Sequence, residues 1–417
     1  MCRELKDSGI PWIGEIPASW GVMPHKRVMH KVKEIKEHYN GENILSLTMR
    51  GVIVRDLDAG GKMPTTFDGY QKVYPNNLLQ CLFDIDVTPR CVGLIKDEGL
   101  TSPAYSQFAM YSNGYAPYYD YLLRYMDDRK TLLHLSKNLR SSLTETDFGA
   151  VLTCVPSLSE QQRIAEFLDR KCGEVDEMIA LQEQIIEELK AYKQSVITEA
   201  VTKGLNPAAP MRDSGIEWIG QIPEHWEVKL LSTLFDEHKH KNSELQEANL
   251  LSQSYGKIER KDINTSEGLL PQSFDGYNII SNGDIVFRLT DLQNDKKSLR
   301  TGLCLETGII TSAYVTIRAR QKLCSAYFHY LVHSYDVCKV FYGMGDGVRQ
   351  GMNYSDLRKL LLLSPPITEQ QAIADYLDEK CADIDSLIQT KQSKIDSLKE
   401  YKKSIIYEYV TGKKEVE

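Results

Sequence analysis

The residue types that perform enzymatic chemistry are present in this chain, but none of them forms a known catalytic motif. The sequence has no G-x-x-x-x-G-K-[ST] phosphate loop, no G-x-S-x-G nucleophile elbow and no H-E-x-x-H zinc motif. It also lacks the [DN]-P-P-[YF] tetrapeptide with which amino-methyltransferases grip a target amine. His329 and His333 lie four residues apart on an expected helix and could share a metal ion, but no third ligand is evident. We therefore predict no catalytic, cofactor or metal site in the chain itself.

Cationic, hydroxyl and aromatic residues in the loops offer a different chemistry, the binding of nucleic acid. Arginine can bind guanine O6 and N7 with two hydrogen bonds, and Lys or Thr can hold phosphate groups. Exposed Lys and Arg are also common on any protein surface, so each residue alone is a weak signal. The candidate DNA-contacting residues are Arg50, Arg55, Lys62, Thr88, Arg90, Tyr105, Lys257, Arg260, Lys261, Arg288, Thr290, Lys296, Lys297 and Arg300.

The net charge of -8 seems to disfavour a nucleic-acid partner, but the acidity is unevenly distributed. Residues 159–204 hold 6 Lys and Arg against 10 Asp and Glu, and residues 367–417 hold 8 against 11. The remaining regions are close to neutral and can carry local basic faces. Nine cysteines without a C-x-x-C pair favour buried thiols over disulfides or zinc ligands. No apolar run is long enough to span a membrane, and the N-terminus lacks a signal peptide, so we expect a cytoplasmic protein.

A long segment occurs twice in the chain. Residues 160–202 and 369–411 are identical at 21 of 43 aligned positions, at a constant offset of 209. Ser159 with Gln162, and Thr368 with Gln371, have the spacing of a helix-capping box, and Gly204 and Gly412 can end each helix. Each copy is therefore expected to form one helix of roughly 65 Å.

Apolar residues in both copies recur at steps of three and four, the pattern of an amphipathic helix. Because a small neighbour cannot bury so long a stripe, we expect the two helices to pair as a coiled coil. The alternative is that each helix packs only on its own domain. The predicted pairing residues are Val175, Ile179, Ile186, Leu189, Val196, Ile384, Ile388, Ile395, Leu398 and Ile405.

A shorter segment is also repeated, DSGIPWIGEIPASW at residues 7–20 and DSGIEWIGQIPEHW at 213–226, with 10 of 14 positions identical. The second copy follows the first long helix, whereas the first copy stands at the start of the chain. The chain thus reads as a ring of two equivalent units opened between its ends, which predicts that the termini lie close together.

The regions between the repeats share scattered anchors and differ in their loops. Short β-type runs at 44–47, 51–54, 92–95, 284–289 and 314–317 alternate with helical patterns near 118–126 and 326–340. We predict an α+β fold with an internal pseudo-two-fold repeat, in which two globular domains are joined by the two long helices. The expected parts are 1–20 (N-terminal segment), 21–156 (domain 1), 157–210 (central helix), 211–366 (domain 2, including the repeat at 213–226) and 367–417 (C-terminal helix).

This organisation resembles the DNA-specificity subunits of type I restriction-modification systems. The shared features are the repeated [DS]-G-[IV]-x-W-[IL]-G-x-[IV]-P-x-x-W segment, the [ST]-E-Q-Q-x-I-A opening of both helices and their E-x-V-T endings. The resemblance covers essentially the whole chain.

The resemblance implies a non-catalytic subunit whose two target-recognition domains each read one half of a bipartite, asymmetric site on double-stranded DNA. The two long coiled-coil helices would pair antiparallel, act as a ruler for the spacer and offer docking surfaces to two methyltransferase subunits. S-adenosylmethionine and ATP would be bound only by partners, the ATP by restriction and translocase subunits.

Two other interpretations compete with this one. A coiled-coil scaffold that binds only protein would show no salt-dependent affinity for DNA. An enzyme with its own methyltransferase or nuclease activity is disfavoured because the corresponding motifs are missing.

Overall fold

The computed structural model describes residues 3–59, 64–136, 141–243, 245–263, 273–290, 292, 299–344 and 351–416. Two compact units divide the chain: unit 1 comprises residues 1–183 and 392–417, and unit 2 comprises residues 184–391. Each unit therefore contains one half of each long helix. None of the helices among the described residues is both long and apolar enough to cross a membrane.

Unit 1 is built on a four-stranded antiparallel sheet with the strand order β4-β11-β8-β9. Four strand pairs accompany it: β5 with β6, β7 with β10, β3 with β12, and β1 with β2. The strands are β1 (Leu5–Asp7), β2 (Glu15–Pro17), β3 (Gly21–Pro24), β4 (Met29–Val32), β5 (Leu45–Thr48), β6 (Gly51–Val54), β7 (Gln71–Val73), β8 (Leu78–Gln80), β9 (Val92–Leu94), β10 (Gly99–Thr101), β11 (Ser106–Met110) and β12 (Leu152–Val155). The helices besides the long pair are η1 (His25–Arg27), α1 (Ala116–Asp128), η2 (Thr131–Leu135) and α2 (Glu145–Ala150).

Unit 2 repeats this topology element by element. Its four-stranded sheet has the order β16-β23-β20-β21, and its pairs are β17 with β18, β19 with β22, β15 with β24, and β13 with β14. The strands are β13 (Met211–Asp213), β14 (Gln221–Pro223), β15 (Glu227–Leu230), β16 (Phe235–Glu237), β17 (Leu251–Ser254), β18 (Lys257–Arg260), β19 (Asn278–Ile280), β20 (Ile285–Phe287), β21 (Thr301–Leu303), β22 (Gly308–Ile310), β23 (Val315–Ala319) and β24 (Leu361–Ser364). The short helices are α4 (Leu231–Leu234), α5 (Ser325–Val337), η3 (Val340–Gly343) and α6 (Tyr354–Leu357). The duplicated α+β fold expected from the sequence is confirmed.

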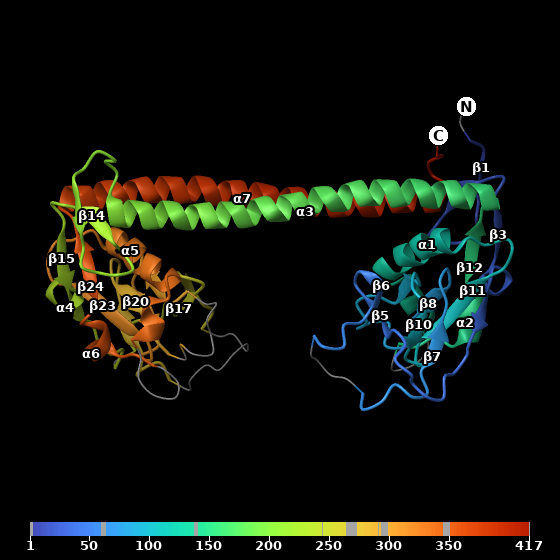
Figure 1. Ribbon diagram of the computed structural model, residues 1–417, viewed down its shortest axis with the longest axis horizontal. Helices are drawn as coiled ribbons and strands as arrows, with labels where there is room; N and C mark the ends of the chain where they lie inside the picture. The colour runs from blue at the N-terminus through green and yellow to red at the C-terminus, as the bar shows by residue number, and fades with distance from the viewer. Residues whose placement is uncertain are drawn as a thin grey trace. The chain divides into compact units, whose positions relative to one another are not determined.

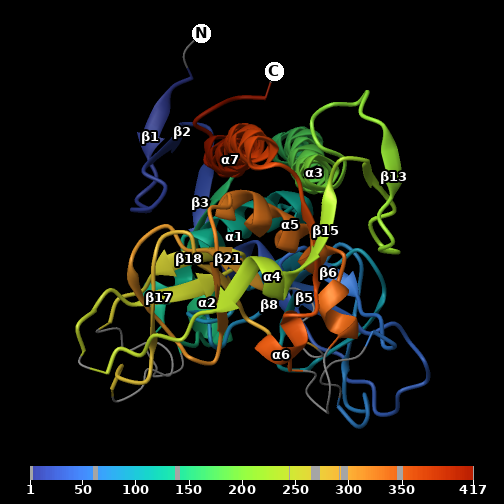
Figure 2. The same cartoon turned by 90° about the vertical axis from the view of Figure 1, so that its left-hand side faces the viewer.

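The long helices are α3 (Leu158–Lys203) and α7 (Ile367–Val410), which lie side by side (Figures 1 and 2). Both helices begin one residue before the predicted N-cap residues, Ser159 and Thr368, so the predicted capping boxes are wrong. Ser159 and Thr368 lie inside the first turn, and the Ser157 hydroxyl accepts the Glu160 backbone N–H instead, at 3.3 Å. The helices start directly after a proline or one residue later, because proline disfavours only the turn that precedes it.

Both helices end where the sequence predicted. Gly204 (φ 74°) and Gly412 (φ 70°) adopt the left-handed conformation that favours glycine and terminate α3 and α7. The last turn then packs on the repeated short segment: a Cβ at Gly412 would stand 2.5 Å from Pro17 Cδ, and one at Gly204 would stand 3.1 Å from the Trp226 ring. Within unit 1, the end of α7 therefore contacts the N-terminal segment without a covalent link. Both termini belong to unit 1 and lie near each other (Figure 1), as expected.

The core of each unit joins its domain to its part of the helix pair. In unit 1, α1 residues such as Tyr118 and Leu122 cluster with Leu168 of α3 and Ile405 of α7. In unit 2, Tyr327 and Leu331 of α5 cluster in the same way with Val201 of α3 and Leu377 of α7. In Figure 2, where unit 2 faces the viewer, α5 lies directly beneath the two long helices. Burial of these apolar side chains, at about 25 cal/mol per Å², holds each domain to its helices.

Candidate nucleic-acid interface and its supporting helices

Ion pairs between α3 and α7 give the register of the helix pair. In unit 1, Lys402 Nζ lies 2.6 Å from Asp176 Oδ2, and in unit 2, Lys193 Nζ lies 2.7 Å from Asp385 Oδ1. The two pairs are equivalent at the offset of 209 and join the helices in antiparallel directions. The pairs are solvent-exposed, so each contributes about 0.2–1 kcal/mol and mainly marks the alignment.

The predicted pairing residues line both sections of this helix pair. Six of them are buried, namely Val175, Ile186, Ile384, Ile395, Leu398 and Ile405. The other four, Ile179, Leu189, Val196 and Ile388, are half-buried. The alternative in which each helix packs only on its own domain does not describe this structure, because residues of both helices share one core in each unit.

Glutamines that the internal repeat places at the start of each helix attach the helices to the domains. Gln161 is buried; its Oε1 accepts the Tyr115 N–H at 2.8 Å, and its Nε2 donates to the Asn113 carbonyl at 2.9 Å. Gln370 accepts the Cys324 N–H at 3.0 Å in the same way. Tyr115 and Cys324 are the N-cap residues of α1 and α5, so one glutamine fixes each domain helix against a long helix. The repetition of E-Q-Q at the start of both helices is the sequence signal from which this attachment could have been predicted.

Tyrosines complete the attachment. The buried Tyr118 hydroxyl donates to the Val410 carbonyl at 2.8 Å, and the equivalent Tyr327 hydroxyl donates to the Val201 carbonyl at 3.3 Å. Burial raises the pKa of both tyrosines well above the ordinary value, so the hydroxyls stay protonated and act as donors. Each domain thus rests on the C-terminal end of one long helix and the N-terminal end of the other.

The candidate DNA-contacting residues of domain 1 fall into two groups. Arg50 is exposed at the tip of the β5–β6 hairpin, whereas Arg55 on the same hairpin is half-buried and has interactions within the domain. Tyr105 is half-buried, and its ring stacks near Phe83 with centroids 6.1 Å apart. Lys62 lies outside the described residues. The structure does not gather these side chains into a single cluster.

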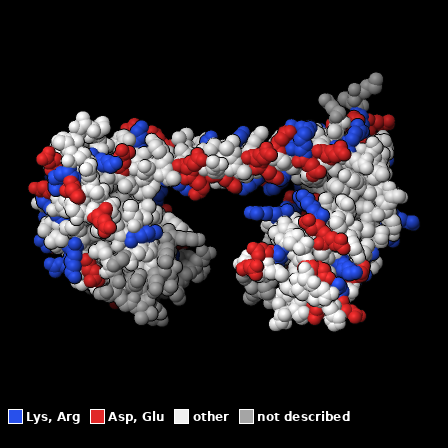
Figure 3. Space-filling view, viewed as in Figure 1, with Lys and Arg blue, Asp and Glu red and all other residues white. Residues whose placement is uncertain are grey.

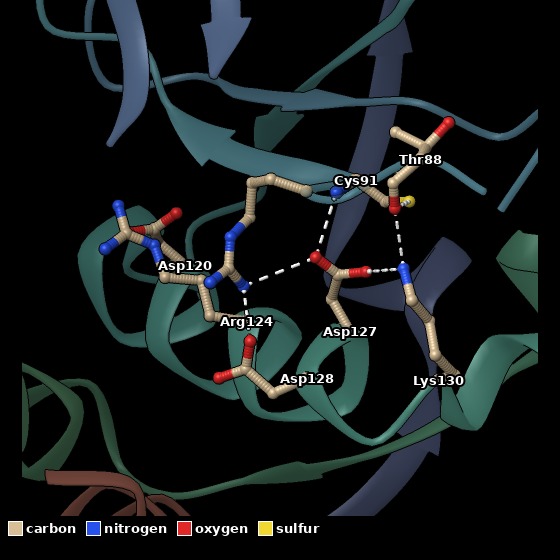
Figure 4. A network of polar contacts seen from close by, with 8 residues as sticks. Thr88, Cys91, Asp120, Arg124, Asp127, Asp128 and Lys130 are labelled. Atoms are coloured by element: carbon tan, nitrogen blue, oxygen red, sulfur yellow. Dashed lines mark hydrogen bonds and ion pairs between the residues drawn. The ribbon is translucent and has the colours of Figure 1, made fainter. Parts of the chain in front are cut away.

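Thr88 and Arg90 belong to a loop that the end of α1 holds in place (Figure 4). Arg90 Nη1 lies 2.9 Å from Asp128 Oδ1 and 3.3 Å from Asp127 Oδ2. Asp127 also accepts the Cys91 backbone N–H at 2.9 Å, and Lys130 Nζ donates to the Thr88 carbonyl at 2.7 Å. The guanidinium of Arg90 is therefore occupied by two carboxylates, and in this structure it shapes the loop.

In domain 2 the exposed candidates are concentrated on strand β18. Lys257, Arg260 and Lys261 are all exposed, and Arg260 Nε lies 2.8 Å from Glu306 Oε2. The Arg260 guanidinium lowers the pKa of Glu306, which keeps the carboxylate charged and the arginine oriented. Beside β18, the domain therefore presents a group of cations of which one is held in a defined direction.

The second set of candidates in domain 2 lies deeper. Arg300 is fully buried; its backbone N–H donates to Asp336, and its Nη1 donates to the Thr290 carbonyl at 2.8 Å. Thr290 is exposed, while Arg288 is half-buried and engaged within the domain. Lys296 and Lys297 lie outside the described residues. The Arg300 backbone N–H thus holds its loop against Asp336 of α5. The equivalent Cys91 N–H holds the corresponding loop of domain 1 against Asp127 of α1.

The histidine pair and the cysteines carry no evident site. Burial lowers the pKa of His329 to about 3 and that of His333 to about 4, so both rings are neutral at physiological pH. Among the described residues, no group of three or more His, Cys, Asp or Glu side chains could hold a metal ion. Burial also raises the pKa of the Cys91 thiol to about 12, which makes it unreactive.

On the face shown in Figure 3, basic and acidic side chains are interspersed along the long helices.

Comparison with known proteins supports this organisation. No family model matches the sequence. The chain is 26% identical over 310 residues to a protein of Methanocaldococcus jannaschii assigned as the MjaX specificity subunit of a type I restriction enzyme, covering 72% of this chain and 69% of that protein.

Two solved structures share the fold over 95% of this chain and 98% of their own, each at 15% sequence identity. One is from a study of the assembly and conformational transition of a type I restriction-modification system, with a TM-score of 0.68. The other is the HsdS subunit of Thermoanaerobacter tengcongensis, with a TM-score of 0.52. This chain is thus similar in sequence to a specificity subunit of a type I restriction enzyme and similar in fold to the HsdS subunit, as its two repeated signatures led us to expect.

Proposed function

We propose that the chain is a non-catalytic, sequence-specific DNA-binding subunit in which each domain reads one half of a bipartite site. The observation that carries this proposal is the repetition of one topology with different surface loops. Equivalent hairpins and sheets recur in both units, but residues 81–91, between β8 and β9, read CLFDIDVTPRC, whereas residues 288–300, between β20 and β21, read RLTDLQNDKKSLR. One scaffold with two unlike reading surfaces suits an asymmetric site, because identical domains would favour a palindromic one.

Domain exchange tests the proposal. Residues 227–366 are replaced with the corresponding domain of a relative, the complex is assembled with its methyltransferase partner, and methylated DNA is sequenced by a single-molecule method. We expect one half of the methylated sequence to change and the other half to stay the same. If both halves changed, the two domains would not read independently.

A salt titration separates this function from a scaffold that binds only protein. A subunit that contacts phosphates should lose affinity for duplex DNA steeply as the salt concentration rises, with a slope that reports the number of contacts. A flat response, or no binding of the assembled complex, would favour the scaffold.

S-adenosylmethionine and ATP are proposed to bind only to partner subunits, with the ATP on a restriction and translocase subunit. The chain's own contribution is positioning, because its sequence lacks the [DN]-P-P-[YF] motif of amino-methyltransferases and, among the described residues, no group of three or more His, Cys, Asp or Glu side chains could hold a metal ion. The purified chain incubated with DNA and labelled S-adenosylmethionine should give no methyl transfer, whereas the complex should.

The long helices are proposed to dock two methyltransferase subunits through equivalent exposed apolar side chains. In unit 1 these are Met178 of α3 and Tyr401 of α7; in unit 2 they are Leu387 of α7 and Tyr192 of α3. At the register of the Lys–Asp bridges, the members of each pair fall at nearly the same level of the helix pair, so we place the same small apolar patch in every unit. Two equivalent patches on one chain fit two copies of one partner.

Patch variants test the docking. The double substitution Tyr192→Ser and Leu387→Ser should reduce the complex from two methyltransferase copies to one, measured as particle mass, and adding Met178→Ser and Tyr401→Ser should remove the second copy. Glu183→Gln, an exposed change on the same helix, is the matched control. Unchanged stoichiometry in the quadruple variant would exclude these patches.

A further inference from the structure

The β17–β18 hairpin ends in an unusual turn. Ser254 and Lys257 pair across the strands, so the turn consists of Tyr255 and Gly256 alone, and both have positive φ, 44° and 83°. This is the geometry of a type I′ turn, whose first position normally holds Asn, Asp or Gly. A bulky aromatic residue with positive φ is rare, and such backbone outliers concentrate at functional sites.

Tyr255 contributes little to the fold. Its side chain is 82% exposed, the largest fraction among the exposed large apolar residues that the structure describes. No hydrogen bond, ring contact or ion pair of its side chain occurs within the described part of the chain. A tyrosine with a strained backbone and so large an exposed fraction contributes little that would explain its presence in the unbound protein.

The base of the hairpin, by contrast, is firmly held. Leu251 is buried in a small core with Ile280, Val286 and Ile310, and Ile258 packs against the same core. Under the turn, Leu299 fills the space beside Gly256, where an added Cβ would stand 3.0 Å from Leu299 Cδ1. The tyrosine is therefore presented on a rigid support.

Cations flank the tip on the same hairpin. Lys257 follows the turn directly, and Arg260 (74% exposed side chain, oriented by Glu306) and Lys261 continue along the strand. An aromatic ring beside exposed cations is suited to a nucleic acid, since the cations attract phosphates and the ring can stack on a base or enter a base step.

The equivalent hairpin of unit 1 also places an apolar residue at its tip, although there the positive φ (99°) belongs to Gly51 and not to the apolar residue. Thr48 pairs with Gly51 across the β5–β6 strands, and Met49 at the tip is 63% exposed with Arg50 beside it. Methionine is also among the apolar residues that proteins insert between base pairs. Each unit therefore places one large apolar side chain at the same point of the fold.

We propose that Tyr255 is a wedge that stacks into the DNA half-site read by domain 2, and that Met49 is its counterpart for the half-site read by domain 1. The proposal rests on the DNA-binding function proposed above and adds that binding distorts the base stack at one defined step in each half-site. Because tyrosine stacks on bases better than methionine, the distortion should be larger in the half-site of domain 2.

Fluorescence of 2-aminopurine tests this. The assembled complex with its methyltransferase subunits binds duplexes that carry the half-sites found by methylation sequencing, with 2-aminopurine placed at each position in turn. Wild type should raise the fluorescence several-fold at one step of the domain 2 half-site. Tyr255→Ala should abolish that signal and weaken binding about tenfold, Tyr255→Phe should keep it, and Met49→Ala should alter only the other half-site.

A stability measurement makes the test independent of folding. Tyr255→Asn places a residue favoured by the turn, so the melting temperature should stay equal or rise while the fluorescence signal is lost. If Tyr255→Ala left fluorescence and affinity unchanged, or lowered the number of bound methyltransferase subunits without DNA, the wedge would be refuted and, in the second case, the tip would be a protein contact. If the wild-type complex bound no DNA at all, the proposed function itself would fail.

Discussion

The indole nitrogen of Trp226 lies 2.9 Å from Oε2 of Glu369, and this hydrogen bond joins the two repeated signatures of the sequence to each other in unit 2. Trp20 donates to Glu160 at the same distance in unit 1. Both tryptophans are buried, and each is the last residue of the short repeat, while each glutamate opens a long helix. The helix pair and the short repeats therefore form one structural unit in each half.

Removing one of these acceptors should destabilise its unit. Glu369→Ala leaves the buried indole N–H without a partner, at a cost of about 1–3 kcal/mol in the free energy of unfolding. Glu369→Gln retains an oxygen acceptor and should cost less. Urea denaturation of both variants measures the difference, and equal stabilities would mean that the hydrogen bond is unimportant.

Two equivalent glycines should be intolerant of a methyl group. A Cβ at Gly99 would stand 2.4 Å from the Asn43 carbonyl oxygen, and one at Gly308 would stand 2.5 Å from that of Asn249. Since backbone must move, Gly99→Ala or Gly308→Ala should destabilise by about 1–3 kcal/mol and impair recognition of one half-site only. Gly173→Ala, in open space on α3, is the control and should stabilise by up to about 1 kcal/mol. Thermal unfolding and half-site binding check both effects, and equal tolerance at all three positions would contradict the close approach.

Acid should weaken unit 1 through a buried histidine. Burial lowers the pKa of His25 from 6.5 to about 4, so the unfolded chain binds a proton more readily than the folded one between these values. Stability is therefore full above pH 6.5 and falls progressively toward pH 4, by at most about 3 kcal/mol for this group. His329 and His333 add the same trend in unit 2. His25→Phe, which retains a ring beside Phe148, should reduce the loss of stability between pH 7.5 and 5 in urea titrations; an unchanged slope would assign the effect to other groups.

Circular permutation should preserve the fold. The end of α7 already packs on Pro17 and Trp20, as the end of α3 packs on Pro223 and Trp226. In the permuted chain, a short linker joins residue 417 to residue 1, and the chain is opened near Pro207. The covalent link between a long helix and the short repeat then lies after α7 in unit 1 and no longer after α3 in unit 2. The permuted chain should have a helical circular dichroism spectrum and a melting temperature close to those of the parent. An insoluble or unfolded product would show that the connection after α3 is essential.

Lengthening one long helix should disturb spacing and leave base recognition unchanged. A heptad inserted into α3 alone shifts one helix by about 10 Å against its partner and breaks the register of the Lys193–Asp385 pair, so assembly or half-site spacing should change. Heptads inserted into both helices after residues 183 and 391 restore that register in each unit. Methylation sequencing should then report the original half-site bases with a longer spacer; altered bases would refute the role of the helices as a ruler.

Much of this architecture could be predicted because the sequence contains repeated segments and periodic apolar residues. The offset of 209 identified the paired helices, and their apolar steps identified the seam that Val175, Ile384 and Ile395 occupy. Helix ends were predictable from glycine, whose left-handed φ few other residues adopt. Helix starts were less so, because Ser157 and Ser159 are both capping residue types and only the folded chain selects between them.

The individual polar residues could not be ranked from sequence. Arg300 and Arg50 look alike as cations in a loop, yet the guanidinium of Arg300 is buried and donates to the Thr290 carbonyl, whereas Arg50 is exposed at a hairpin tip. The sequence by itself determined the duplication, the helix pairing and the resemblance to specificity subunits, because these depend on local pattern along the chain. Only the tertiary structure decided which polar side chains are buried and bonded within a domain and which are exposed to a partner. This depends on residues that the fold brings together from distant parts of the chain.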